Sequence, residues 1–239
     1  MMRSVAVIFV LLLFSVGVFS QANALPAATP TKLPDTVPVK PGAPVVNRGV
    51  DKGTVVGRTY TNLKFGFEIV FPDTWLIPDD DFEAAMKSQG FDLELKPPQS
   101  LTPGSQKDLN KALQRVTIML TAYRSMPGSK MNAIMRVSAE DLSANPQIKD
   151  AVDYFDAMRA TFKAVKLTPD FTYSETGAEQ LGSMQFGYID TSSKEGKKRM
   201  YATVRGGYAI MFTLSYSNDE DLATMRRILD EGDFSLTKQ

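Results

Sequence analysis

Apolar and polar residues alternate along several short stretches of the chain, which is the pattern of half-buried β-strands. In residues 67–71, Phe67, Ile69 and Phe71 fall on one face, and Pro72, which has no backbone donor, is expected to end the strand. The other stretches with this pattern predict strands at 59–61, 115–124, 132–138, 178–190, 198–205, 208–216 and 233–236.

Apolar residues recur at spacings of three and four in other stretches, which predicts amphipathic helices. The clearest helix follows Asn145-Pro146, an N-cap residue with proline at the first helical position. Residues 79–90 and 217–232 predict two shorter helices with acidic first turns and glycine at their ends. Runs of strands separated by helices predict an α+β fold, with an antiparallel sheet covered by helices.

The first 24 residues have the order of a signal peptide: Arg3, an apolar run at 5–18, and an Ala22-Asn23-Ala24 cleavage motif. We expect cleavage after Ala24, with an uncleaved N-terminal anchor as the alternative. No later stretch is long and apolar enough to cross a bilayer. The sequence therefore predicts an exported protein, periplasmic or secreted, without a membrane span after cleavage.

Residues 25–57 differ in composition from the rest, with a proline every three or four positions in much of the segment. Such a segment favours extended polyproline II, and we expect a disordered linker. The globular domain is expected to cover 58–239.

Charge and composition exclude several classes of function. The 27 basic and 27 acidic residues balance each other. The sequence has no basic stripe of the kind that indicates nucleic-acid binding. The chain has no cysteine, which excludes thiol nucleophiles, zinc–thiolate sites and iron–sulfur clusters. It also has no histidine, the commonest general base and transition-metal ligand. Catalysis would have to use carboxylates, lysine, tyrosine or serine, so we expect a protein that is not an enzyme and has no cofactor.

Two segments carry a resemblance to a known family. They are YTNLKFGFEIVFPDTW at 60–75 and GYAIMFTLS at 207–215, the second followed by an acidic-started helix and Phe234. Together they resemble the PsbP-like superfamily, including its exported bacterial members of unknown function. The resemblance covers about residues 58–237 and implies an α-β-α sandwich around a central antiparallel sheet. It also implies a binding or assembly module, and leaves the activity open because fold does not fix function.

The aromatic residues of 60–75 all have structural explanations, and we expect Phe67, Ile69 and Trp75 to be buried together. A ligand-stacking role for Trp75 is the alternative.

Two groups of charged residues are candidates for binding. Asp79, Asp80 and Asp81 are the best weak candidates for a hard cation such as calcium, although acidic residues at a helix N-terminus have the same pattern. The second group could dock an acidic partner or an anionic lipid surface, with a solvated turn as the alternative. It consists of Lys194, Lys197, Lys198 and Arg199.

The leading hypothesis is a non-enzymatic exported binding or assembly module of the cell envelope, with an envelope protein or a small ligand as its partner. The alternative is a hydrolase that uses carboxylates or Ser/Lys without histidine. Such an enzyme should hold ionisable side chains with mutually shifted pKa values in a deep cleft. A purely structural envelope protein is a third hypothesis.

Overall fold

The computed structural model describes residues 50–88, 113–127, 129, 132–164, 169–194 and 196–236. The predicted signal peptide and the predicted linker up to residue 49 lie outside these ranges. In the described ranges, no helix is both long and apolar enough to cross a membrane.

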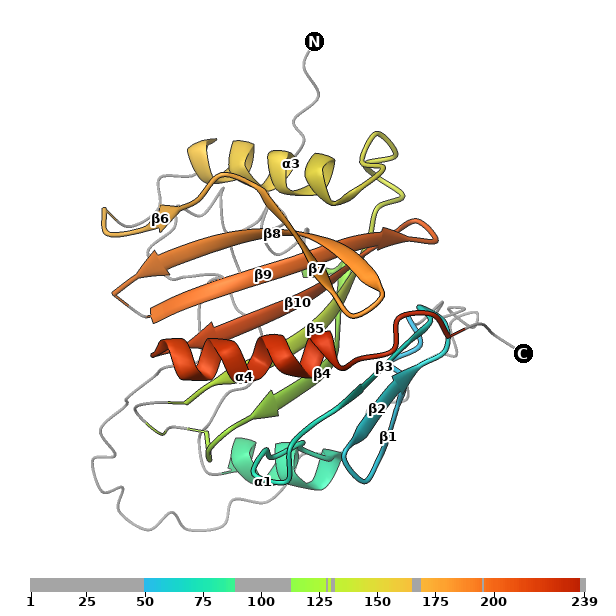
Figure 1. The fold of residues 1–239 in the computed structure, drawn as a ribbon, viewed down its shortest axis with the longest axis vertical. Coiled ribbons are helices and arrows are strands. Elements are labelled where there is room, and N and C mark those ends of the chain that lie inside the picture. Colours follow the sequence, from blue (N-terminus) through green and yellow to red (C-terminus); the bar gives the residue numbers. More distant parts are fainter. Residues whose placement is uncertain are drawn as a thin grey trace, which may run out of the picture.

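Seven antiparallel strands form the main sheet, in the order β4-β5-β10-β9-β8-β6, with β7 also paired to β8 (Figure 1). The alternating pattern had predicted all of these strands except β6, with β7 and β8 as one strand. The bounds are β4 Val116–Tyr123, β5 Ile134–Asp141, β6 Thr172–Tyr173, β7 Gly177–Leu181, β8 Met184–Ser193, β9 Gly196–Arg205 and β10 Tyr208–Tyr216.

A separate three-stranded sheet precedes the main one, in the order β1-β2-β3. Its strands are β1 Thr54–Val56, β2 Thr59–Asn62 and β3 Phe67–Val70. The first of these falls inside the predicted linker, so the folded domain begins before residue 58. Proline-rich composition ends before Gly53, and the short strand is held by pairing to β2 rather than by apolar burial, because all three of its residues are exposed.

Helices cover both faces of the main sheet, in agreement with the predicted α+β class. Helix α3 (Ala151–Ala164) packs on β8 and β9, while α4 (Asp219–Asp230) packs on β10, β7 and β3 from the other face (Figure 1). Helix α1 (Asp80–Ser88) follows the small sheet. We name the two faces of the main sheet the α3 face and the α4 face.

The core between the small sheet and the α4 face is rich in aromatic rings. Phe67 contacts Phe212 and Phe234 with ring centroids 5.3 and 6.0 Å apart. Trp75 is 2 % exposed, and Phe67 and Ile69 are buried in the same cluster. The expectation that these side chains belong to the interior is confirmed, and the stacking role considered for Trp75 has no exposed ring to support it.

Two element boundaries differ from the sequence-based expectation. The single strand predicted at 178–190 is two strands, because Gly182 turns the chain with a φ of +54°. A Cβ there would lie 2.9 Å from the Asp230 carbonyl oxygen, so the turn and its packing against the end of α4 both need glycine.

The long helix begins later than predicted. Asn145 forms a turn with Ile148, and the Asp150 carboxylate caps α3 by accepting hydrogen bonds from the Val152 and Asp153 amides at 2.8 and 2.9 Å. Both Asn145 and Asp150 are suitable N-cap residues, so the sequence alone did not distinguish them.

Candidate functional site

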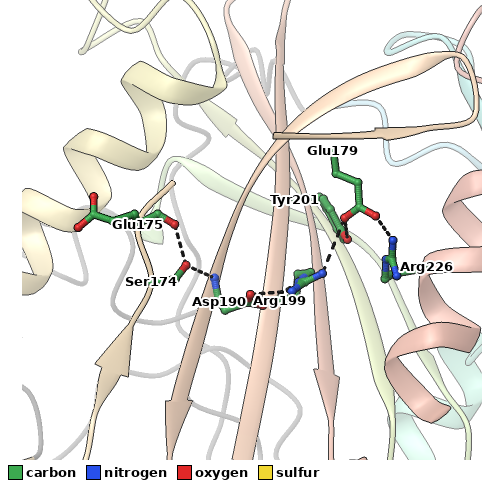
Figure 2. A network of polar contacts seen from close by, with 7 residues as sticks. All are labelled: Ser174, Glu175, Glu179, Asp190, Arg199, Tyr201 and Arg226. Atoms are coloured by element: carbon green, nitrogen blue, oxygen red, sulfur yellow. Dashed lines mark hydrogen bonds and ion pairs between the residues drawn. The ribbon is translucent and has the colours of Figure 1, made fainter. Parts of the chain in front are cut away.

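A cluster of charged side chains connects β7, β8, β9 and α4 on the α4 face (Figure 2). Arg199 donates two hydrogen bonds of 2.7 Å to Asp190, directly opposite on the neighbouring strand. Two planar groups meeting in this way form the strongest kind of side-chain ion pair. We call the cluster the paired network and define it as Glu179, Asp190, Arg199, Tyr201 and Arg226.

Glu179 is the centre of the paired network. It pairs with Arg226 of α4, accepts a 2.5 Å hydrogen bond from the Tyr201 hydroxyl, and lies 3.7 Å from Arg199. The guanidinium of Arg199 also lies 4.6 Å from the centroid of the Tyr188 ring, a cation–π contact. These contacts of Glu179 connect strand β7 and helix α4 to the rest of the main sheet.

The pKa values in the paired network follow from this pairing. The hydrogen bonds with Asp190 raise the pKa of Arg199, and burial followed by the bond to Glu179 raises the pKa of Tyr201 to about 12. Two carboxylates face two guanidinium groups, so the formal charges sum to zero. The tyrosine stays protonated at neutral pH, and the network has no base–nucleophile pair suited to chemistry.

A second polar cluster lies on the α3 face. On β5, Met135, Val137 and Ala139 point into the aromatic core, so the alternating residues Arg136, Ser138 and Glu140 point to the opposite face. We call these last three the β5 strip. All three are buried, although polar side chains in a strand usually face water.

Glu140 in the β5 strip is only 2 % exposed. Its Oε2 accepts a 3.1 Å hydrogen bond from the Tyr154 hydroxyl of α3, and its Oε1 has no hydrogen-bond partner. Burial raises the pKa of Glu140 to about 8, against smaller lowering effects of Tyr154 and Arg115. The carboxyl group is therefore protonated and neutral at neutral pH. Burial also raises the pKa of Tyr154 well above its ordinary value.

Arg136 differs from the neutral Glu140 because it keeps its charge. Its side chain is 8 % exposed, and burial lowers its pKa, with only the Tyr123 side chain acting against that effect. No carboxylate in the described ranges forms an ion pair with it. An arginine remains protonated even when buried, so the β5 strip carries one positive charge without a described counter-charge.

The predicted basic group is separated by the structure. Lys194 and Lys197 are exposed at the β8–β9 hairpin, Lys198 is buried on the α3 face, and Arg199 belongs to the paired network on the α4 face. Successive residues of a strand point to opposite faces, which explains why neighbours in sequence do not form one surface. A docking role for this hairpin stays a prediction and would rest on Lys194 and Lys197.

The predicted acidic group lies at the start of α1. The Asp79 carboxylate accepts a 2.8 Å hydrogen bond from the Phe82 amide, as an N-cap does, and Asp81 is exposed in the first turn. The position of the Asp80 side chain lies outside the described part. No group of three acidic residues in the described ranges is arranged to hold a metal ion.

Sequence reasoning missed both polar clusters. The segment IMRVSAED does alternate, and this was a usable signal for the polar β5 strip. However, a polar strand face ordinarily lies toward solvent, so this segment did not indicate burial. The paired network joins residues from 179 to 226 and has no local signal.

The comparison with known proteins finds a solved structure that is similar to the chain. No family model and no curated protein matches the chain. The chain is similar to the solved solution structure of cyanobacterial PsbP from Synechocystis sp. PCC 6803, with 13 % identity and a TM-score of 0.40. The similarity covers 76 % of this chain and 95 % of that one. A similarity of this size says nothing about what the chain binds, and the α+β class rests on the elements described above.

Proposed function

We propose that the protein is a non-enzymatic, exported binding or assembly module of the cell envelope. The observation that carries this proposal is the β5 strip, where a buried guanidinium has no described counter-charge. Burying a charge without a partner costs folding free energy, and such groups are common at functional sites. A bound partner that supplies the missing interaction would account for it.

Two features of the sequence support the exported location. The N-terminus has the order of a cleavable signal peptide, and a proline-rich segment separates it from the folded domain.

A ligand-dependent melting experiment tests the proposal. The full chain, purified from the cells that produce it, would be heated with divalent metal salts and with fractionated small molecules and proteins of the envelope. A ligand that binds only the folded state raises the Tm in a saturable manner. We expect at least one fraction to do so. The absence of any shift, together with no co-purifying partner, would argue against a binding role.

The hydrolase remains the alternative, because one observation favours it. Glu140 and Tyr154 are a buried, hydrogen-bonded pair whose pKa values are both raised, and Ser138 lies on the same strand face. Hydrolysis of ester, peptide or glycoside test substrates, with an apparent pKa near 8 that is lost in Glu140→Gln, would favour the enzyme over the binding module.

A further inference from the structure

Arg136 is surrounded by hydroxyl groups on the α3 face. In the antiparallel register, it lies directly opposite Thr213 on β10 and Thr121 on β4, and Ser138 follows it on the same face of β5. Side chains directly opposite each other in a sheet have Cβ atoms roughly 5 Å apart. The Cβ atoms of these residues therefore lie together in one small region of the sheet.

One of these hydroxyl groups lacks a partner. Thr213 is 2 % exposed, and its Oγ1 makes no hydrogen bond. A buried hydroxyl without a partner is uncommon in folded proteins and lowers the stability of the folded state. Arg136 and Thr213 thus lie opposite each other in the sheet. The Thr213 hydroxyl has no hydrogen-bond partner, and no carboxylate in the described ranges pairs with Arg136.

An acceptor that both satisfies the Thr213 hydroxyl and compensates the charge of Arg136 must be an anion. A neutral acceptor would satisfy the Thr213 hydroxyl but would leave the charge of Arg136 uncompensated. Guanidinium groups bind carboxylates with two parallel hydrogen bonds. A monoanionic carboxylate matches the single charge of the Arg136 guanidinium.

We propose that Arg136 and Thr213, with Ser138 and Thr121 beside them, form a binding site for the carboxylate group of a small ligand. The proposal rests on the binding role proposed above and adds the chemical class of the ligand. The carboxylate accepts hydrogen bonds from the guanidinium and from Thr213 Oγ1, which satisfies both groups. Ser138 and Thr121 provide further hydroxyl donors at the edge of the site.

The test compares matched probes on the full chain at constant ionic strength. Acetate and butyrate carry the carboxylate, butyramide has the same shape as butyrate without its charge, and inorganic phosphate tests the competing oxyanion. We expect a saturable Tm rise of about 5 °C when butyrate reaches about 100 times its Kd, and no rise with butyramide. Titration calorimetry then gives the Kd directly.

Variants assign the effect to the site. Arg136→Met should weaken butyrate binding by at least about 100-fold, because it removes a buried partner of a charged group. Arg136→Lys keeps the charge without the bidentate geometry and should lose about 10-fold, and it carries the test should the methionine variant fail to fold. Thr213→Val should also weaken binding, whereas Arg199→Met, in the paired network, should leave the Kd unchanged.

Two kinds of result would overturn the proposed carboxylate site. The first is a Tm that rises equally with butyramide, rises with phosphate but with neither carboxylate, or does not rise with any probe. The second is a butyrate Kd that is unchanged in Arg136→Met or Arg136→Lys. If an envelope fraction still stabilises Arg136→Met as strongly as the native chain, the binding role stands and the assignment to Arg136 fails. The two proposals can therefore fail separately.

Discussion

The paired network and the β5 strip lie on opposite faces of the same sheet, and both place charged groups in partly or fully buried positions. In the paired network, every charged group faces an opposite charge at hydrogen-bonding distance or close to it. In the β5 strip, Arg136 has no described counter-charge, and Glu140 Oε1 has no hydrogen-bond partner. The strip is also less exposed than most of the network.

This difference in charge pairing distinguishes polar groups that stabilise the fold from polar groups that indicate a binding role. The charges of the paired network are matched within the fold, although Arg226 Nε has no hydrogen-bond partner, and the network can be explained by the connection of β7 and α4 to the sheet. A cluster that holds a buried charge without a described opposite charge lowers the stability of the folded chain, and this indicates a role beyond the fold. Substitutions in the two clusters should therefore have opposite effects on stability.

The largest expected effect concerns Glu140 and pH. Its pKa is about 8 in the folded chain, against 4.5 as the ordinary value, so the folded state holds a proton that the unfolded state releases between these pH values. The contribution of this group is fully present below pH 4.5 and is lost as the pH rises through 8. Between pH 5 and pH 8 the loss should be on the order of 3 kcal/mol.

Glu140→Gln removes this pH dependence and provides the measurement. The unfolding free energy of the native chain, minus that of the variant, should fall steadily from pH 5 to pH 8 in urea titrations. Tyr154→Phe removes a hydrogen bond that lowers the pKa of Glu140, so the decline should extend to higher pH. A difference that stays constant across this range would show that Glu140 is ionised in the folded chain.

The second effect concerns Arg199 in the paired network. Arg199→Met leaves Asp190 without its bidentate partner and removes one of the two guanidinium groups near Glu179. These groups are between one-sixth and one-third exposed, so the cost should lie between the values for surface and buried pairs, at about 2 kcal/mol. Urea unfolding should show a lower midpoint with an unchanged slope.

Lys197→Met is the matched control for Arg199→Met. Lys197 lies on the same strand and the same face but is exposed, so its replacement should change stability by less than about 0.5 kcal/mol. Equal losses in the two variants would mean that the paired network contributes nothing beyond an ordinary surface charge.

The sequence predicted the strands and helices of both clusters because alternation and helical spacing are local properties. The same local reasoning placed Phe67, Ile69 and Trp75 in the interior, where the structure has them. It failed at Gly182, where a two-residue turn interrupts a stretch whose apolar pattern continues on both sides.

The clusters themselves depend on which strands become neighbours. Glu179, Asp190 and Arg226 meet only because β7 and β9 both pair with β8 while α4 crosses the same face. For the β5 strip, the alternation of Arg136, Ser138 and Glu140 indicates a polar face, but burial depends on which residues cover that face, as Tyr154 of α3 does at Glu140. No local pattern carries that information.

The third prediction concerns Arg136, whose substitution should raise the unfolding free energy, whereas substitution of Arg199 should lower it. Arg136→Met removes a buried charge and keeps an unbranched apolar stem, so in the absence of ligand the chain should gain about 1 kcal/mol of unfolding free energy. The same urea titration as for Arg199→Met gives the comparison directly. A loss of stability in both variants would mean that Arg136 is compensated within the chain, and the contrast between the two clusters would disappear.

The smallest effect concerns Thr213. Thr213→Val replaces a buried hydroxyl that makes no hydrogen bond with a methyl group of nearly the same shape, and it should stabilise the chain by about 0.5 kcal/mol. Thr61→Val is the matched control on a strand, because Thr61 Oγ1 donates a 2.7 Å hydrogen bond to Glu68, and this variant should lose about 1 kcal/mol. Thermal unfolding of both variants in buffer without carboxylates measures the difference in sign. Should Thr213→Val instead lose stability as Thr61→Val does, the Thr213 hydroxyl has an acceptor in the unliganded chain, and only Arg136 would remain as an unmatched donor.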